Sequence, residues 1–179
     1  MKMLQRFPVT CFCLFIIVIV YFSIKWGEVD PRPFMFQPGV LGRSTFTWNF
    51  VHLVHTHILF NAIACLQLGS LMQLQLRSSR FAILTAILCL LVSLAAFYWI
   101  EYPLVGFSGI LMAWVGLGLV LLWNIKPLRQ MLLVWAVLNV LIGLVPGISF
   151  LGHVLGLVVG LVVGFLFQIL RKTWQVIEN

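Results

Sequence analysis

The sequence predicts an all-α, polytopic membrane protein. Of its 179 residues, 63% are hydrophobic and only 8% are charged, and the mean hydropathy is +1.13. A soluble domain carries about 25% charged residues, so we exclude a soluble globular protein. The hydrophobic residues stand in long unbroken runs, without the alternation that is typical of outer-membrane barrel strands. Because lipid offers no partners to free backbone groups, the remaining class is a helical bundle.

At about 20 residues per membrane span, the length allows roughly six helices and no sizeable soluble domain. We therefore treat residues 1–179 as a single membrane domain. The first apolar run lacks a small-residue cleavage site, so we expect a retained helix and not a signal peptide. The apolar runs predict helices at about residues 9–24, 51–75, 81–100, 103–123, 128–145 and 150–170.

The segments between the runs predict the connections. The one long polar stretch, residues 27–47, contains three prolines and predicts an irregular, partly interfacial outer loop. Pro103 suits the first turn of a helix. The pair Pro146-Gly147 predicts a tight connection before the last helix.

The charges predict the orientation in the membrane. The formal net charge is +7, but the basic residues are scattered between apolar runs, so we expect no nucleic-acid partner. Six helices place both termini on one side. With that side inside, the inner segments hold eight of the 11 Lys and Arg residues, and three of the four acidic residues lie outside. The positive-inside rule therefore predicts cytoplasmic N- and C-termini.

Polar residues within the predicted spans are candidate functional groups, because burying them in lipid is costly. His57 and Asn61 lie in the second predicted helix, Ser108 in the fourth and His153 in the sixth. All three helices run from outside to inside, and the four residues fall at a similar depth below the outer surface. Their shared depth predicts one site.

Helical spacing supports this site. His57 and Asn61 are four residues apart and share a helix face. Gly156 and Gly160 follow His153 in a pattern that lets a neighbouring backbone approach closely. We therefore expect the fourth and sixth helices to bring Ser108 within hydrogen-bond reach of His153. A serine hydroxyl needs such a base to become a nucleophile.

The glycines around the serine suggest a second element of this chemistry. In the sequence Gly106-Phe107-Ser108-Gly109, the serine stands at a predicted helix start. Free backbone N–H groups at a helix start can stabilise a negatively charged oxygen. His57 and Asn61 would add side-chain donors.

These motifs together resemble the rhomboid family of intramembrane serine proteases, in its minimal six-helix bacterial form. The matching residues are His52-x4-His57-x3-Asn61, Gly106-Phe107-Ser108-Gly109 and His153-x2-Gly156-x3-Gly160. The resemblance implies that Ser108 is the nucleophile and His153 the general base, without a carboxylate. It implies an oxyanion hole formed by His57, Asn61 and the Ser108 amide, with His52 beside the site.

The resemblance also implies the setting of the reaction. The substrates would be transmembrane segments of single-pass membrane proteins, cleaved in the lipid of a bacterial inner membrane without a cofactor or metal. Two residues depart from the family pattern or fall outside it. Met112 stands where the family often has a tyrosine that packs on the catalytic histidine, and His55 has no counterpart role.

Two alternatives stay open. A metal site or metal transporter could use the histidines at positions 52, 55, 57 and 153, since imidazoles bind zinc and copper. Against it, the sequence has no intramembrane carboxylate, no H-E-x-x-H motif and no C-x-x-C pair. The second alternative is a non-catalytic rhomboid-like protein that holds transmembrane clients. Such relatives are expected to lack the serine or the histidine, and this chain has both.

Overall fold

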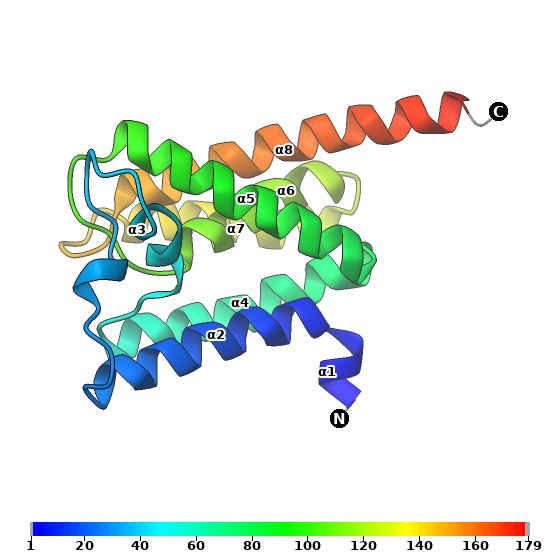
Figure 1. The fold of residues 1–179 in the computed structure, drawn as a ribbon. Coiled ribbons are helices and arrows are strands. Elements are labelled where there is room, and N and C mark those ends of the chain that lie inside the picture. Colours follow the sequence, from blue (N-terminus) through cyan, green and yellow to red (C-terminus); the bar gives the residue numbers. More distant parts are fainter. Residues whose placement is uncertain (1, 178–179) are drawn as a thin grey trace.

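A computed structural model describes residues 2–177, with side chains described for residues 3–171. The described chain folds into helices joined by irregular segments, and no strand occurs within that range (Figure 1). The helices are α1 (Lys2–Arg6), α2 (Pro8–Lys25), η1 (Arg32–Phe34), α3 (Ser44–Thr47), η2 (Trp48–Phe50), α4 (His55–Gln75), α5 (Ser78–Trp99), α6 (Ser108–Leu121), α7 (Lys126–Ile142) and α8 (Phe150–Ile177).

Four of these helices, α2, α4, α5 and α8, are long and apolar enough to cross a membrane. The protein is therefore a multi-pass membrane protein, as the composition predicts. The predicted fourth and fifth spans correspond to α6, with 14 residues, and α7, with 17. At 1.5 Å per residue, α6 is about 21 Å long and falls short of a hydrocarbon core of about 30 Å. The count of six spans remains a prediction.

The short α6 lies at the centre of the bundle. Twelve of its 14 residues are buried, so other helices surround it on all sides. A helix in this position needs no lipid-facing surface, and its ends can stop short of the membrane surfaces.

Two predicted helix starts are wrong. The fourth helix begins at Ser108 and not at Pro103, because the preceding segment is pinned in an extended form. The Phe36 N–H donates to the Leu104 carbonyl at 3.0 Å, and Gly106 has a φ of +115° that no right-handed helix accommodates. The second helix begins at His55 and not at residue 51, since residues 51–54 precede its first turn.

The closest contact in the bundle joins α6 to α8, backbone against backbone. A β-carbon added to Gly156 would lie 2.2 Å from the Gly109 carbonyl oxygen. One added to Gly160 would lie 2.1 Å from the Ala113 carbonyl oxygen. Any side chain larger than hydrogen at these two positions would push the helices apart.

Side chains join α2 to α4 at both ends of the pair. Toward the termini, the Thr10 hydroxyl donates to Gln73 Oε1 at 2.7 Å inside the bundle. Toward the loops, the Tyr21 hydroxyl contacts His55 Nδ1. These contacts fix the helix that carries His57 and Asn61.

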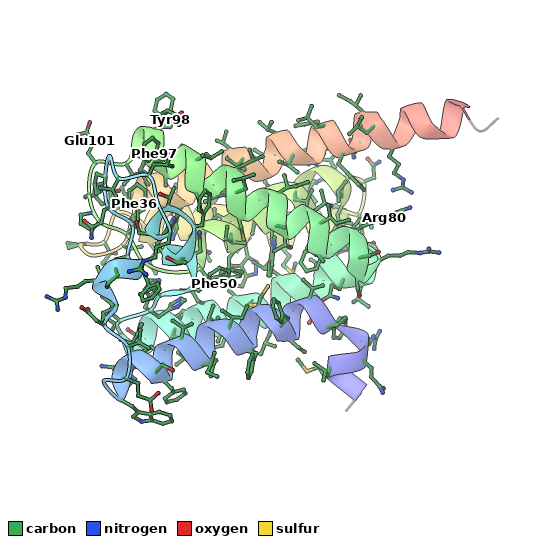
Figure 2. All side chains as sticks on the ribbon, viewed as in Figure 1. Phe36, Phe50, Arg80, Phe97, Tyr98 and Glu101 are labelled. Atoms are coloured by element: carbon green, nitrogen blue, oxygen red, sulfur yellow. The ribbon has the colours of Figure 1, made fainter. Side chains whose placement is uncertain are left out.

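The loops and the chain ends lie at opposite ends of the bundle (Figure 1). The segments 26–54, 100–107 and 143–149 gather at one end, where α4, α6 and α8 each begin. The helix α1 and the last turns of α8 lie at the other end. Figure 2 shows Glu101 at the loop end and Arg80 at the opposite end, in line with the predicted charge asymmetry.

Candidate active site

Ser108 is the first residue of α6 and is half-buried. The Ile110 and Leu111 N–H groups donate to the Phe107 carbonyl at 3.0 and 3.1 Å. The N–H groups of Ser108 and Gly109 come before these two residues and have no acceptor within the helix. The helix start therefore presents two free N–H groups beside the Ser108 hydroxyl, and that hydroxyl makes no hydrogen bond within the described part of the chain.

His153 lies in the first turns of α8 and is 4% exposed. Its Nδ1 lies 2.6 Å from the carbonyl oxygen of Asn139 in α7. A carbonyl oxygen only accepts, so Nδ1 carries the proton and donates. The neutral ring then has its lone pair on Nε2, the nitrogen free to accept a proton. A backbone carbonyl thus sets the tautomer, a role that a carboxylate has in Ser-His-Asp triads.

The turns that carry Ser108 and His153 adjoin each other. A β-carbon on Gly109, the residue after Ser108, would lie 3.7 Å from the carbonyl oxygen of Gly152, the residue before His153. The contact between Gly109 and Gly156 lies on the same faces. The structure has no hydrogen bond between the Ser108 hydroxyl and the His153 ring.

His57 lies against the loop that leads to Ser108. A β-carbon on Gly106 would be 2.4 Å from His57 Cε1 and 2.6 Å from Nε2, so only glycine fits beneath the ring. Asn61 stands one turn further along α4, is 4% exposed and donates from Nδ2 to the His57 carbonyl at 2.8 Å. Its Oδ1 is buried without a partner. His57 therefore lies against the loop before α6, whereas the Asn61 side chain bonds to the backbone of its own helix α4.

His52 is buried and holds the chain just before Ser108. Its Nε2 accepts the Phe107 N–H at 3.3 Å, and its Nδ1–H donates to the Phe50 carbonyl at 3.3 Å. The ring also meets the His57 ring edge-on, with 4.9 Å between centroids. Burial lowers the pKa of His52 to about 4, and the nearby His57 adds to this effect. A neutral His52 therefore links the end of the outer loop to the start of α6.

Met112 and His55, which depart from the family pattern or fall outside it, both pack between helices. Met112 is 2% exposed, and its β-carbon would lie 3.1 Å from a β-carbon on Gly156, so it packs against α8 one turn from His153. His55 contacts the Tyr21 hydroxyl and stacks edge-on against its ring, with centroids 5.5 Å apart. His55 thus belongs to the contact between α2 and α4.

The metal alternative gains no support from this geometry. Among residues 3–171, no group of three or more His, Cys, Asp or Glu side chains could hold a metal ion. The rings of His52 and His153 each donate from Nδ1 to a backbone carbonyl instead.

Two contacts of this region could not be predicted from the sequence. The Asn139 carbonyl belongs to the backbone and carries no sequence signal. The hydroxyl of Tyr102 lies 2.9 Å from the Ser149 hydroxyl at the start of α8. Neither Tyr102 nor Ser149 stands in a motif.

The comparison with known families agrees with the motifs. The profile of the Rhomboid domain family matches residues 42–169, which include every candidate site residue. The chain belongs to the rhomboid family. No curated protein matches the sequence significantly. The family is one of intramembrane serine proteases, and it also has non-catalytic members.

Proposed function

We propose that this rhomboid protein is an intramembrane serine endopeptidase that cleaves transmembrane segments of single-pass membrane proteins. The observation that carries the proposal is the contact between the first turns of α6 and α8, with Ser108 on one and His153 on the other. A hydroxyl at a helix start, on a turn that adjoins the turn of a neutral imidazole, suits acyl transfer.

In the proposed reaction, Ser108 Oγ attacks the scissile carbonyl carbon of the client. His153 Nε2 accepts the hydroxyl proton, and its Nδ1–H stays on the Asn139 carbonyl as the ring becomes positively charged. No hydrogen bond joins the two residues in the free protein. Catalytic hydrogen bonds of this kind often tighten only when substrate binds.

The developing negative oxygen would be stabilised by the Ser108 amide together with the His57 and Asn61 side chains. His57 is suited to this role because its ring lies over Gly106, two residues before the nucleophile. His153 then returns the proton to the leaving amine, and the acyl-enzyme forms. Water from the loop end hydrolyses the acyl-enzyme, with His153 acting as base again.

We infer that the loop end faces the outside of a bacterial inner membrane and that both termini are cytoplasmic. At the end opposite the loops, Arg77 stands in the connection between α4 and α5, and Arg80, Lys126 and Arg129 stand in the first turns of α5 and α7. Glu28, Asp30 and Glu101 belong to the loop segments. This asymmetry follows the positive-inside rule.

The decisive experiment treats the purified full chain in detergent with a fluorophosphonate probe and, separately, with a model single-pass client. We expect covalent labelling of Ser108 and cleavage of the client. Ser108→Ala and His153→Ala should each abolish both, because one removes the proposed nucleophile and the other the proposed general base. Ser70→Ala in α4 serves as a matched serine control and should retain labelling and cleavage.

Two results would overturn the proposal. Undiminished cleavage by either Ser108→Ala or His153→Ala removes the dyad. A wild-type chain that is folded, binds the client and is neither labelled nor able to cleave favours the non-catalytic client-binding alternative.

A further inference from the structure

The segment that leads to Ser108 is fixed at three points. The Leu104 carbonyl accepts the Phe36 N–H at 3.0 Å, and the Gly106 N–H donates to the Trp48 carbonyl at 3.0 Å. The Phe107 N–H donates to the ring of His52 at 3.3 Å. These bonds hold the chain between α5 and α6 against the outer loop, and they therefore fix the position of Ser108.

The turn that carries His153 begins differently. Most residues of the connection 143–149 are exposed. Ser149 caps α8, since its Oγ accepts the Gly152 N–H at 2.9 Å and its carbonyl accepts the His153 N–H at 3.1 Å. A displacement of Ser149 would therefore move the first turn of α8 and His153 with it.

One side-chain contact joins these two segments. The Tyr102 hydroxyl lies 2.9 Å from Ser149 Oγ, across 47 residues of sequence. Within the described part of the chain, no other side-chain hydrogen bond ties the connection 143–149 to a segment outside α7 and α8. The contact of Gly109 with α8 reaches the Gly152 carbonyl and Gly156, but it includes no atom of Ser149, so it does not restrain Ser149 directly.

We propose that Tyr102 is a positioning residue that acts through Ser149 to hold the first turn of α8, and with it His153, in register with Ser108. The proposal rests on the proposed protease function. Tyr102 belongs to the segment 100–107 that leads to Ser108. Its hydrogen bond to Ser149 therefore connects the turn that carries Ser108 with the turn that carries His153. This hydrogen bond lies at the loop end, on the side from which water reaches the site.

The test compares Tyr102→Phe with wild type in the purified full chain. The second-order rate constant for fluorophosphonate labelling of Ser108 should fall roughly 3- to 10-fold, the range expected for the net effect of one hydrogen bond. For a model client, kcat should fall by a similar factor with KM unchanged, because Tyr102 acts on the base and not on client binding. The unfolding temperature should stay near that of wild type.

The matched control is Tyr98→Phe, near the end of α5. Tyr98 is 77% exposed, and its hydroxyl has no hydrogen bond among the described residues, so this variant should react as wild type does. A double-mutant cycle tests the partner. Ser149→Ala should slow labelling, and adding Tyr102→Phe should slow it no further. Ser149→Thr keeps a hydroxyl and should restore most of the rate.

The outcomes separate the two proposals. A wild-type chain without labelling at Ser108 overturns both. Labelling of wild type and Tyr102→Phe at equal rates, or faster labelling of the variant, overturns the positioning role alone. The positioning role also fails if Tyr102→Phe has its full effect in the Ser149→Ala background, or if the loss of rate only follows a loss of thermal stability.

Discussion

Both α6 and α7 contact α8, but they do so by different means. The contact between α6 and α8 is made by backbone atoms, with Gly156 against Gly109 and Gly160 against Ala113. The helix α7 buries only Leu132 and Ala136 among its 17 residues. Its hydrogen bond to α8 at the site runs from His153 Nδ1 to the Asn139 carbonyl.

Because their contacts with α8 differ, α6 and α7 have different effects on the proposed dyad. The dense contact of α6 with α8 fixes how far apart Ser108 and His153 stand, since neither helix can shift without a backbone clash. The lightly buried α7 fixes the tautomer and orientation of the His153 ring. The separation of the proposed dyad is therefore built into the core, whereas the state of its base depends on a helix with mostly exposed side chains.

The largest effect is expected where the dense contact is broken. Gly156→Ala and Gly160→Ala would each place a methyl group about 2 Å from a carbonyl oxygen of α6. We expect each to destabilise the fold by more than about 2 kcal/mol, as overpacking in a rigid core does. Thermal unfolding in detergent measures this. Gly42→Ala is the control, because a β-carbon there meets nothing within 4 Å. Equal unfolding temperatures for Gly160→Ala and Gly42→Ala would contradict the role given to this contact.

A second substitution sharpens the comparison at the start of α6. Gly106→Ala combines a positive φ with a collision against the His57 ring, whereas Gly39→Ala has a φ of +71° and no neighbour within 4 Å. Strain alone costs about 1–3 kcal/mol, and it applies to both variants. We expect only Gly106→Ala to lower the rate of Ser108 labelling, by at least about 10-fold, because it displaces a proposed oxyanion donor. Similar rates of labelling for both variants would contradict the proposed role of His57 as an oxyanion donor.

The same comparison marks how far the sequence could predict this protein. The spans α2, α4, α5 and α8 follow from apolar runs, because a long hydrophobic run has few stable alternatives in lipid. The first residues of α4 and α6 could not be predicted from the apolar runs. Residues 103–107 are apolar enough for helix, but their backbone bonds to the distant residues Phe36 and Trp48. Residues 51–54 are also apolar enough, but the ring of His52 there bonds to the distant Phe107 N–H. Local propensity carries no information about such partners.

The candidate site divides in the same way. The side chains of the proposed dyad, Ser108 and His153, are polar residues in an apolar chain and could be proposed from their types and depth. Contacts that orient them could not. The Asn139 carbonyl is present at every residue position, and a tyrosine at the membrane surface such as Tyr102 has an ordinary interfacial explanation.

Acid should weaken the hydrogen bond from the Phe107 N–H to the His52 ring, just before Ser108. The pKa of His52 is lowered to about 4 in the folded chain, against an ordinary value of 6.5. The unfolded chain therefore binds the proton more readily, and the stability present above pH 6.5 is lost as the pH falls toward 4. Between pH 7 and pH 5 this loss amounts to about 2 kcal/mol.

Unfolding measured at both pH values checks this, with His52→Gln for comparison. The glutamine variant should be less stable than wild type at pH 7, yet should lose less stability between pH 7 and pH 5. An equal loss in both proteins would assign the acid sensitivity to other groups.

The smallest effect is expected at Asn139, and it tests the orienting half of the comparison. Asn139→Ala removes a side chain that donates only to Trp135, one turn back in α7, and leaves the backbone carbonyl in place. Client cleavage should therefore stay within about 2-fold of wild type, a difference of less than about 0.5 kcal/mol. Nitrogen-15 NMR of labelled histidines, assigned with His153→Gln, should show a protonated Nδ1 and an unprotonated Nε2 at neutral pH in both proteins. An Nε2–H tautomer in wild type would mean that α7 does not orient the base, because the lone pair would then point away from Ser108.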